Sequence, residues 1–382
     1  MALPLPLSIA ALTVVLSSEA QAADATRFPP ALRGDFEIQY DVGGETGRLL
    51  EDDVEVGRRR LTSHAITYTG TFSPVTGLAM YVGLPHLVSD RVRFTDAQEM
   101  AYDPRLENGT MVGTASLPDR DAERGTGMGG VWIGLKGAPM HRDLYTRRND
   151  RVSWVLDAGY RFRDETNFWS YGPRGKRGAG AGAPAFRFQA AASTKHRIAE
   201  PYLQATLLRS GRITMDVVDQ NDQVVASGVE FRPASTVDGV LGVQYTVAEY
   251  GQGAMVAVDM HSYFGYSTWQ DIPSGLMLPS VLDSSAQLPA TMSEATRIGV
   301  GGGVNYRFIE YLQLNVRGNI GVNSGGRVEH FYPVSMGLGA LEWSVQTTLQ
   351  FKIRDLLWAG TQPASNDQPF IDPPEDDLPE AE

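Results

Sequence analysis

One stretch of the sequence carries an acid, an imidazole and two hydroxyl groups close together: Asp259, His261, Ser262 and Tyr263. Such groups could act as the acid, the base and the nucleophile of a hydrolase. The stretch alternates apolar and polar residues, however, and consecutive residues of a β-strand point to opposite faces. His261 and Ser262 therefore could not meet in one site, and we interpret His261 as a hydrogen-bonding residue of a polar interior.

Metal and nucleotide chemistry are not indicated either. The six histidines are scattered along the chain without the spacing of metal ligands. Residues 299–303 (GVGGG) superficially resemble a nucleotide-binding loop, but they lie inside an alternating segment that no helix follows. Glycines there would permit sharp curvature or make room for interior side chains. The sequence therefore indicates no catalytic residue, no metal and no cofactor, and it does not predict an enzyme.

The elements that must position these side chains are β-strands. Period-two alternation dominates the chain, whereas helical periodicity is rare. The polar faces are rich in Arg, Asn and Gln, which do not suit a dry core. We predict an all-β chain of about twelve strands, with about ten to fourteen as the range. The predicted strands are residues 34–43, 58–72, 77–84, 127–137, 151–163, 184–193, 201–209, 236–249, 254–268, 296–308, 311–323 and 339–353.

Several features favour a membrane barrel over a soluble sandwich, which would place the apolar side of each strand inside. Many segments run to ten residues or more, which suits the about 9–11 tilted residues of a membrane strand. Aromatic residues such as Trp154, Tyr160 and Trp343 fall toward segment ends, where a girdle at the lipid interface would lie. We therefore predict a transmembrane antiparallel up-and-down β-barrel.

The connections between the predicted strands give the strongest indication. Counted from the first, odd connections are long and even ones are short or moderate, as in outer-membrane barrels with long external loops. The long connections include residues 85–126, 164–183, 210–235 and 269–295. A soluble sandwich has no reason to sort its loops in this way.

Composition excludes several other classes. The 382-residue chain has 41 Gly, no Cys, 20% charged residues and a formal net charge of −12. This combination does not match a helical membrane protein or a disulfide-stabilised scaffold. The acidic balance also gives no electrostatic reason to expect a nucleic-acid partner.

In its alternation, its loop asymmetry and segments such as residues 130–136 (GVWIGLK), the chain resembles the Gram-negative outer-membrane β-barrels, which include porins and transporters. The resemblance covers residues 34–353 and matches a pattern without a signature, so no subfamily follows. It implies a location in the bacterial outer membrane, contact with outer-membrane lipid and lipopolysaccharide, and insertion by the barrel-assembly machinery. The family's final strand usually ends the chain on an aromatic residue, and here a further segment follows.

The two ends of the chain lie outside the predicted barrel. Residues 1–22 combine an apolar run with an A-x-A site, which is typical of a cleaved secretory signal peptide. Residues 23–33 would form a short N-terminal periplasmic segment with no room for a plug. Residues 354–382 are acidic and rich in Pro, and we predict a disordered periplasmic tail.

The polar faces of the alternating segments would line the lumen. The candidate lumen residues are Asp35, Glu37, Asp41, Asp157, Arg161, Asp259, His261, Arg297, Asn305, Arg307, Arg317, Glu342 and Lys352. Acids of the first strand and bases of the tenth and eleventh strands would come close once the barrel closes. A transverse field of that kind would orient polar solutes.

These residues favour passive passage of a small solute through a polar lumen, gated by the connection 85–126 folding inward. A barrel of about twelve strands lies between small filled barrels and wide porins. The alternative is therefore a non-conducting structural or ligand-binding barrel that acts through its extracellular loops. A lipid-active outer-membrane hydrolase built around His261 is the least favoured hypothesis.

Overall fold

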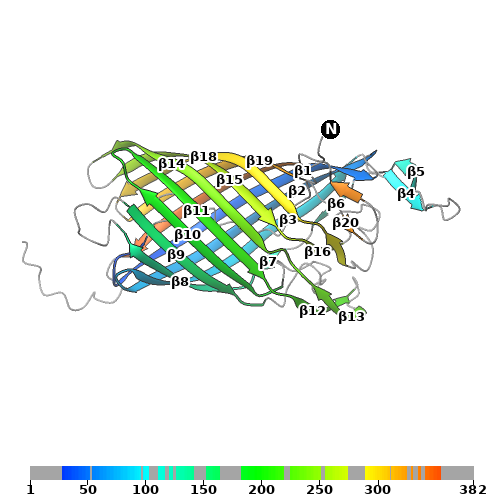
Figure 1. The fold of residues 1–382 in the computed structure, drawn as a ribbon, viewed down its shortest axis with the longest axis horizontal. Helices are drawn as coiled ribbons and strands as arrows, with labels where there is room; N and C mark the ends of the chain where they lie inside the picture. Colours follow the sequence, from blue (N-terminus) through cyan, green and yellow to red (C-terminus); the bar gives the residue numbers. More distant parts are fainter. Residues whose placement is uncertain are drawn as a thin grey trace, which may run out of the picture.

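The fold is a closed β-barrel. Twelve strands pair antiparallel in chain order and the last pairs with the first, so the sheet has no open edge in the barrel wall (Figure 1). No helix among the described residues is long and apolar enough to cross a membrane. The computed structural model describes residues 28–51, 54–95, 98–102, 111–116, 120–123, 126–141, 152–163, 182–218, 224–250, 254–273, 289–309, 311–324, 328–329, 334–336 and 340–353.

Each predicted segment overlaps one strand of the barrel wall. In order around the barrel the strands are β1 (Arg33–Glu51), β2 (Val54–Val75), β3 (Leu78–Thr95), β8 (Trp132–Met140), β9 (Val152–Arg161), β10 (Ala185–Thr194), β11 (Ala199–Ser210), β14 (Thr236–Glu249), β15 (Met255–Ser267), β18 (Ala295–Ile309), β19 (Leu312–Asn323) and β22 (Ala340–Ile353). The prediction of an all-β up-and-down barrel of about twelve strands is therefore confirmed.

The two ends of the barrel differ in their connections. At one end, which we call the turn end, short turns such as residues 76–77 and 195–198 join neighbouring strands. At the other, which we call the loop end, the connections carry further strands (Figure 1). These are β4 (Gln98–Tyr102), β5 (Met111–Ser116), β6 (Arg120–Glu123), β7 (Gly127–Met128), β12 (Ile213–Val218), β13 (Val224–Phe231), β16 (Gln270–Pro273), β17 (Pro289–Met292), β20 (Val328–Glu329) and β21 (Val334–Met336).

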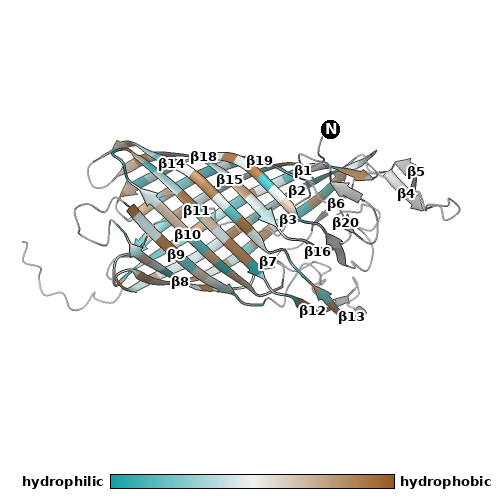
Figure 2. Ribbon diagram, in the orientation of Figure 1, coloured by the Kyte–Doolittle hydropathy of each residue, from teal (hydrophilic) through white to brown (hydrophobic). Residues whose placement is uncertain are grey.

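Apolar side chains cover the outer surface of the wall. Leu156, Phe188 and Leu241 are 50%, 52% and 61% exposed, and Figure 2 shows such hydrophobic positions alternating with hydrophilic ones along the strands. The residues between them turn inward, as Asp157 does with 5% exposure. An apolar band of this extent suits lipid, where a closed barrel satisfies every strand hydrogen bond internally.

The first three strands extend farther toward the loop end than the sequence predicted. β1 and β2 stay paired up to Glu51 and Val54, and residues 85–95 continue β3. Strands β6 and β7 pair with β3, and β4 pairs with β5 in a separate hairpin beyond the barrel. The prediction that residues 85–126 form one loop folding inward as a gate is therefore wrong for these strands, because their backbone hydrogen bonds hold them to the wall or to each other.

We call this part of the three strands the aqueous extension (residues 45–51, 54–62 and 88–95). Along it the polarity of the two strand faces is reversed relative to the rest of the barrel wall. Its inward side chains include Leu49, Leu61, Val92 and Phe94, each at most 1% exposed. Its outward side chains include the exposed charges Arg58, Arg60, Arg91 and Arg93. Glu45, Arg59 and Asp90 are also buried on this inner face, where Arg59 donates to Glu45 at 3.3 Å. A largely apolar inner face under a charged outer face is the pattern of a sheet in water. The predicted first and third strands ended before this change, whereas the predicted second strand already included residues 58–62.

One aromatic ring enters the interior at the turn end. Phe28, 5% exposed, packs with Ala79, Ala138 and Val155 and lies 6.3 Å from the His141 ring. Since Val155 follows the outward Trp154 and faces inward, the Phe28 ring lies inside the wall. The length of the segment before β1 did not predict this contact.

Candidate functional site in the barrel interior

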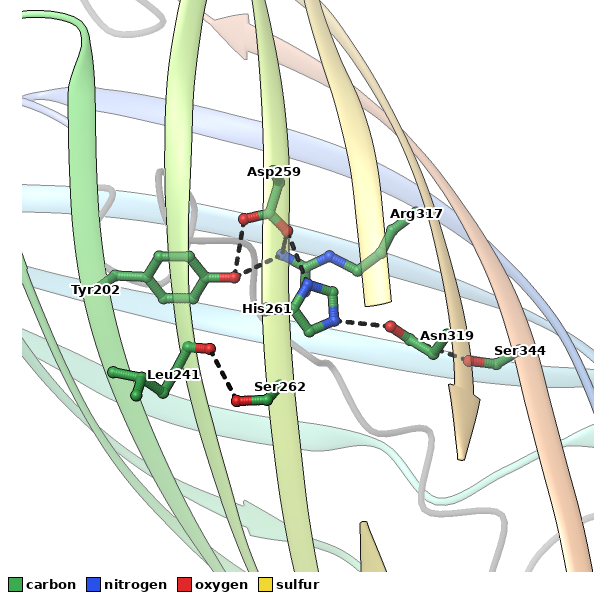
Figure 3. Close-up of polar contacts among 8 residues, drawn as sticks. All are labelled: Tyr202, Leu241, Asp259, His261, Ser262, Arg317, Asn319 and Ser344. Carbon is green, nitrogen blue, oxygen red and sulfur yellow. Dashed lines mark hydrogen bonds and ion pairs between the residues drawn. The ribbon is translucent and has the colours of Figure 1, made fainter. Parts of the chain in front are cut away.

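A hydrogen-bonded group of side chains from three strands fills part of the interior (Figure 3). We call it the closed cluster: Tyr202 (β11), Asp259 and His261 (β15), Arg317 and Asn319 (β19). Tyr202 donates its hydroxyl proton to Asp259 Oδ1 at 2.9 Å, and Arg317 donates to Asp259 Oδ2 at 2.9 Å. His261 Nδ1 lies 2.9 Å from the same oxygen, and its Nε2 lies 2.7 Å from Asn319 Oδ1.

Asp259 is the centre of the closed cluster, because both of its oxygens accept hydrogen bonds. The exposed fractions of the side chains are 2% for Arg317, 0% for His261 and 9% for Asp259. A carboxylate buried against a guanidinium is stable only when the pair is well hydrogen-bonded, as this one is. The closed cluster is therefore a rigid brace between β11, β15 and β19, with little surface left for a solute.

The hydroxyl proposed for hydrolysis lies on the other face of the wall. Ser262 Oγ donates to the backbone oxygen of Leu241 at 3.5 Å, and Figure 3 shows it pointing away from His261. Ser262 is exposed, whereas Asp259 and His261 are buried. The structure thus places the acid and the imidazole on one face and the serine on the opposite face, as strand geometry predicted.

Glycines of neighbouring strands make room for the large interior side chains. A Cβ on Gly242 would overlap the Tyr202 ring, and one on Gly301 would overlap the His261 ring. Gly299 and Gly321 similarly accommodate the Tyr263 ring. The prediction that residues 299–303 make room for interior side chains therefore holds at Gly299 and Gly301, because each lets a ring from β15 lie flat along the wall.

A second group of interior side chains lies on β3, β8, β9 and β10. Tyr81 donates to Asp157 Oδ1 at 2.9 Å, and Arg187 donates to the Tyr81 hydroxyl at 2.8 Å. Arg187 also lies 3.6 Å from Asp157 Oδ2. This Tyr–Asp–Arg arrangement repeats that of Tyr202, Asp259 and Arg317 on a different part of the wall.

Here cations and aromatic rings alternate in a stack, which we call the cationic column: Arg161, Trp132, Arg187, Tyr81 and Lys136. The centroid of the Trp132 ring lies 5.4 Å from Arg161 and 5.3 Å from Arg187. The centroid of the Tyr81 ring lies 5.4 Å from Arg187 and 5.5 Å from Lys136. All four distances fall within the range of cation–π attraction. The stack holds charged groups in fixed positions along the wall.

The cationic column is more open than the closed cluster. The Arg187 side chain is 19% exposed, and Trp132, Lys136 and Arg161 are half-buried. In the contacts that the structure describes for the column, Arg187 pairs with Asp157, while Arg161 and Lys136 face the rings of Trp132 and Tyr81.

The other predicted lumen residues also lie on the barrel strands. Asp35 accepts from Gln350 at 3.4 Å, and Asp41 accepts from Gln39 at 2.8 Å and from Gln346 at 3.1 Å. Arg297 pairs with Asp238 at 2.6 Å, and Glu342 accepts a hydrogen bond from Tyr263 at 2.7 Å. Asn305 is buried and Arg307 is half-buried. Across β1 and β22, Glu37 lies opposite Gln350 and Lys352 lies opposite Asp35.

The acids of β1 and the bases of β19 do come within one strand of each other, since Gln346 of β22 pairs with both Asp41 and Arg317. The bases of β18 lie one strand farther away. The ion pairs among the described residues run the other way around the barrel, however. Arg317 pairs with Asp259 of β15, and Arg297 pairs with Asp238 of β14. These bases are therefore held against their own side of the wall.

Several interior residues were missed by the sequence analysis. Tyr81, Trp132, Lys136 and Arg187 belong to the cationic column, and Tyr202 belongs to the closed cluster. Trp132, Gly134 and Lys136 alternate with the outward Ile133 and Leu135, and this was the available signal. It was missed because an aromatic residue near a strand end also suits a lipid girdle.

No family model matches the chain, and no curated protein matches it. An outer membrane channel from Pseudomonas putida F1 is similar in structure, with 14% identity over 88% of this chain and 100% of that chain and a TM-score of 0.48. Also similar is the translocator domain of the autotransporter NalP from Neisseria meningitidis, with 8% identity over 86% of this chain and 91% of that chain and a TM-score of 0.41. A deletion mutant of the TodX monoaromatic hydrocarbon channel is similar as well, with 11% identity over 91% of this chain and 96% of that chain and a TM-score of 0.39. At such values the barrel assignment rests on the strand pairing of this chain.

Proposed function

We propose that this protein is an outer-membrane channel through which small polar solutes pass passively. The observation that carries the proposal is the combination of an apolar outer wall with charged, partly exposed side chains inside, of which Arg187 is one. The partial exposure of Arg187 inside the wall supports a lumen that side chains do not fill completely. The proposal includes contact with outer-membrane lipid and lipopolysaccharide and insertion by the barrel-assembly machinery.

Single-channel recording in planar lipid bilayers tests this function. The purified protein, with heat-modifiable gel mobility as the measure of folding, is expected to give discrete and reproducible current steps. Arg187→Glu would reverse one interior charge and is expected to shift the ratio of anion to cation permeability. The matched control is Leu241→Ala, which changes an outward side chain and is expected to leave that ratio unchanged. A folded barrel without current steps would rule out the channel.

The loop end supports a second candidate function, ligand binding outside the membrane. The β12–β13 hairpin is held by its own polar contacts, with Arg212 and Glu230 at 2.8 Å and Ser227 and Asp216 at 2.7 Å. β16, β17 and β20 form a further small sheet. Deleting residues 213–231 would separate the candidates, because a binding barrel would lose its ligand while a channel would retain its current.

A further inference from the structure

We propose that a group of outward arginines at the loop end binds the phosphate groups of lipopolysaccharide. This group, which we call the arginine patch, consists of Arg48 (β1), Arg58 and Arg60 (β2), and Arg91 and Arg93 (β3). The proposal rests on the outer-membrane location and gives the lipopolysaccharide contact of the proposed function a definite place. It does not require current through the lumen.

The five arginines lie next to one another on the outer face of three paired strands, and all five are exposed. Arg48 lies directly opposite Arg58 across β1 and β2, and Arg60 lies directly opposite Arg93 across β2 and β3. Side chains opposite each other in an antiparallel pair have Cβ atoms about 4.5–5.5 Å apart, where like charges are destabilising. Two such pairs side by side therefore favour anions bound from outside.

One carboxylate, Glu55, partly balances the first pair. It lies 3.0 Å from Arg58 and 3.9 Å from Arg48, and the side chains of these arginines are 58% and 59% exposed. Ion pairs as exposed as these are weak, because water screens them. Both guanidinium groups therefore remain accessible to a phosphate, which an arginine binds with two parallel hydrogen bonds.

The second pair lies beside strand β6. In the backbone register Asp121 lies opposite Arg93, and Glu123 lies opposite Arg91. Arg60 is two strands away from β6, which is about 10 Å. It is exposed and has no ion-pair partner among the described residues. Arg60, together with the first pair, is therefore the part of the arginine patch that an external anion would meet.

A β-bulge gives the arginines of β3 their outward direction. The pairing of β2 with β3 shifts by one residue at Val88. Before the bulge the outward residues of β3 have even numbers, as the 53% exposed Val82 does, and after it they have odd numbers. Without the bulge Arg91 and Arg93 would point into the barrel. Bulges often re-aim side chains beside functional sites, and this one completes a basic outer face.

The arginine patch lies just beyond the lipid-facing band. On the same outer face the Tyr40 hydroxyl and His64 Nδ1 are 2.8 Å apart, and aromatic residues of this kind are typical of the membrane–water interface. Arg60 lies four residues from His64 toward the loop end, which is about 10 Å along the membrane normal for a strand tilted by about 40°. The headgroup layer is about 5–8 Å thick. A long arginine side chain can reach back into it.

Lipopolysaccharide is the lipid whose charge and position fit the arginine patch. Long connections lie outside the cell in outer-membrane barrels, so the loop end faces the outer leaflet. There lipopolysaccharide carries phosphate groups close to its acyl chains. A zwitterionic phospholipid has an ammonium group beside its phosphate and would gain less from a cluster of arginines.

The test is a titration of fluorescently labelled lipopolysaccharide with the purified, folded protein at constant detergent, followed by fluorescence anisotropy. Protein-free micelles give the blank, and dephosphorylated lipopolysaccharide with the same label is the second probe. The protein is expected to bind the phosphorylated form at least about tenfold more tightly. Added salt is expected to reduce this difference, because it screens exposed charges.

Two substitutions locate the site without touching the contact between Arg58 and Glu55. Arg48→Gln and Arg60→Gln are each expected to weaken lipopolysaccharide binding about fivefold, which is the contribution of one base near an anionic surface, and the double variant about tenfold to thirtyfold. Arg197→Gln is the matched control, because it removes the same charge from an exposed position at the turn end. It is expected to leave binding unchanged. Heat-modifiable gel mobility checks the folding of each variant.

Equal affinity for the two forms of lipopolysaccharide, unchanged affinity in both single variants, or an equal loss in Arg197→Gln would overturn the proposal. Current steps in bilayers together with any of these results would leave the channel function standing without the site. Lipopolysaccharide binding that the patch variants weaken, in a protein that carries no current, would support the site and refute the channel.

Discussion

The closed cluster and the cationic column contain the same Tyr–Asp–Arg arrangement in two parts of one wall. In the closed cluster the guanidinium is 2% exposed and a histidine completes the contacts of the carboxylate. In the cationic column the guanidinium is 19% exposed and two further cations face the rings. The same arrangement is therefore closed to solvent in one part of the wall and partly open in the other.

The largest difference is expected in stability after removal of the carboxylates. Asp259→Ala leaves the Arg317 guanidinium buried without its carboxylate, and we expect a loss of about 3–5 kcal/mol in unfolding free energy. Asp157→Ala is expected to cost less, because Arg187 keeps contact with solvent. Urea titration of both variants in lipid vesicles, followed by gel mobility, measures the two losses. Equal losses would remove the distinction between the two groups.

The next largest loss of stability is expected at the glycines that make room for interior rings. In Gly242→Ala the new Cβ overlaps the Tyr202 ring, and in Gly134→Ala it overlaps the Tyr81 ring. Forcing a packed ring aside is expected to cost about 1–3 kcal/mol in each variant. Gly137→Ala is the control, because its Cβ would meet nothing within 4 Å. The same urea titration measures these losses in unfolding free energy. A loss in Gly137→Ala as large as in the other two variants would show that overlap with a ring is not the cause.

The tyrosine hydroxyls should show the same order on a smaller scale. Tyr202→Phe removes a hydrogen bond to an Asp259 oxygen in the closed cluster, and Tyr81→Phe removes one to Asp157. Each loss is expected to be about 0.5–1.5 kcal/mol. The loss in Tyr202→Phe should be the larger, because Arg317, which also donates to the Tyr202 hydroxyl, is 2% exposed, whereas Arg187, which donates to the Tyr81 hydroxyl, is 19% exposed and can turn to solvent. Unfolding midpoints measured side by side would decide the order.

The smallest expected effect on stability is at the end of the column. Lys136→Gln is expected to change the unfolding free energy by less than about 0.5 kcal/mol, because Lys136 is half-buried and its described contact is a cation–π contact with Tyr81. A destabilisation comparable to that of Asp259→Ala would mean that the column also serves as a brace.

The sequence predicted the barrel well where one face meets lipid. Residues 296–308 alternate so regularly that the strand was located within one residue at each end of β18. The same reasoning stopped early on β1, β2 and β3, because beyond the lipid band the apolar residues turn inward and the charges turn outward. A search for alternation with the apolar face toward lipid locates a strand inside the membrane. It misses the part of the same strand that continues into water, where the polarity of the two faces is reversed.

The interior site was only partly predictable. Strand parity was enough to separate His261 from Ser262 and to give Asp157, Arg161 and Asp259 an inward direction. Parity does not give the partners, because the Tyr81–Asp157 contact joins residues 76 positions apart through three strands. Which interior charges are balanced depends on these long-range pairings, and these follow only from the register of the closed barrel.

The aqueous extension also sets the vertical position of the barrel in a bilayer. If the barrel sank by two residues, Arg60 and Arg93 would approach the lipid, where a charge costs about 0–1 kcal/mol near the interface and about 2–4 kcal/mol at the midplane. If it rose, the outward apolar residues of the same strands would leave the lipid. The strands that carry the aqueous extension therefore resist both movements and fix the depth of the barrel. A bilayer of different thickness must adapt to that depth.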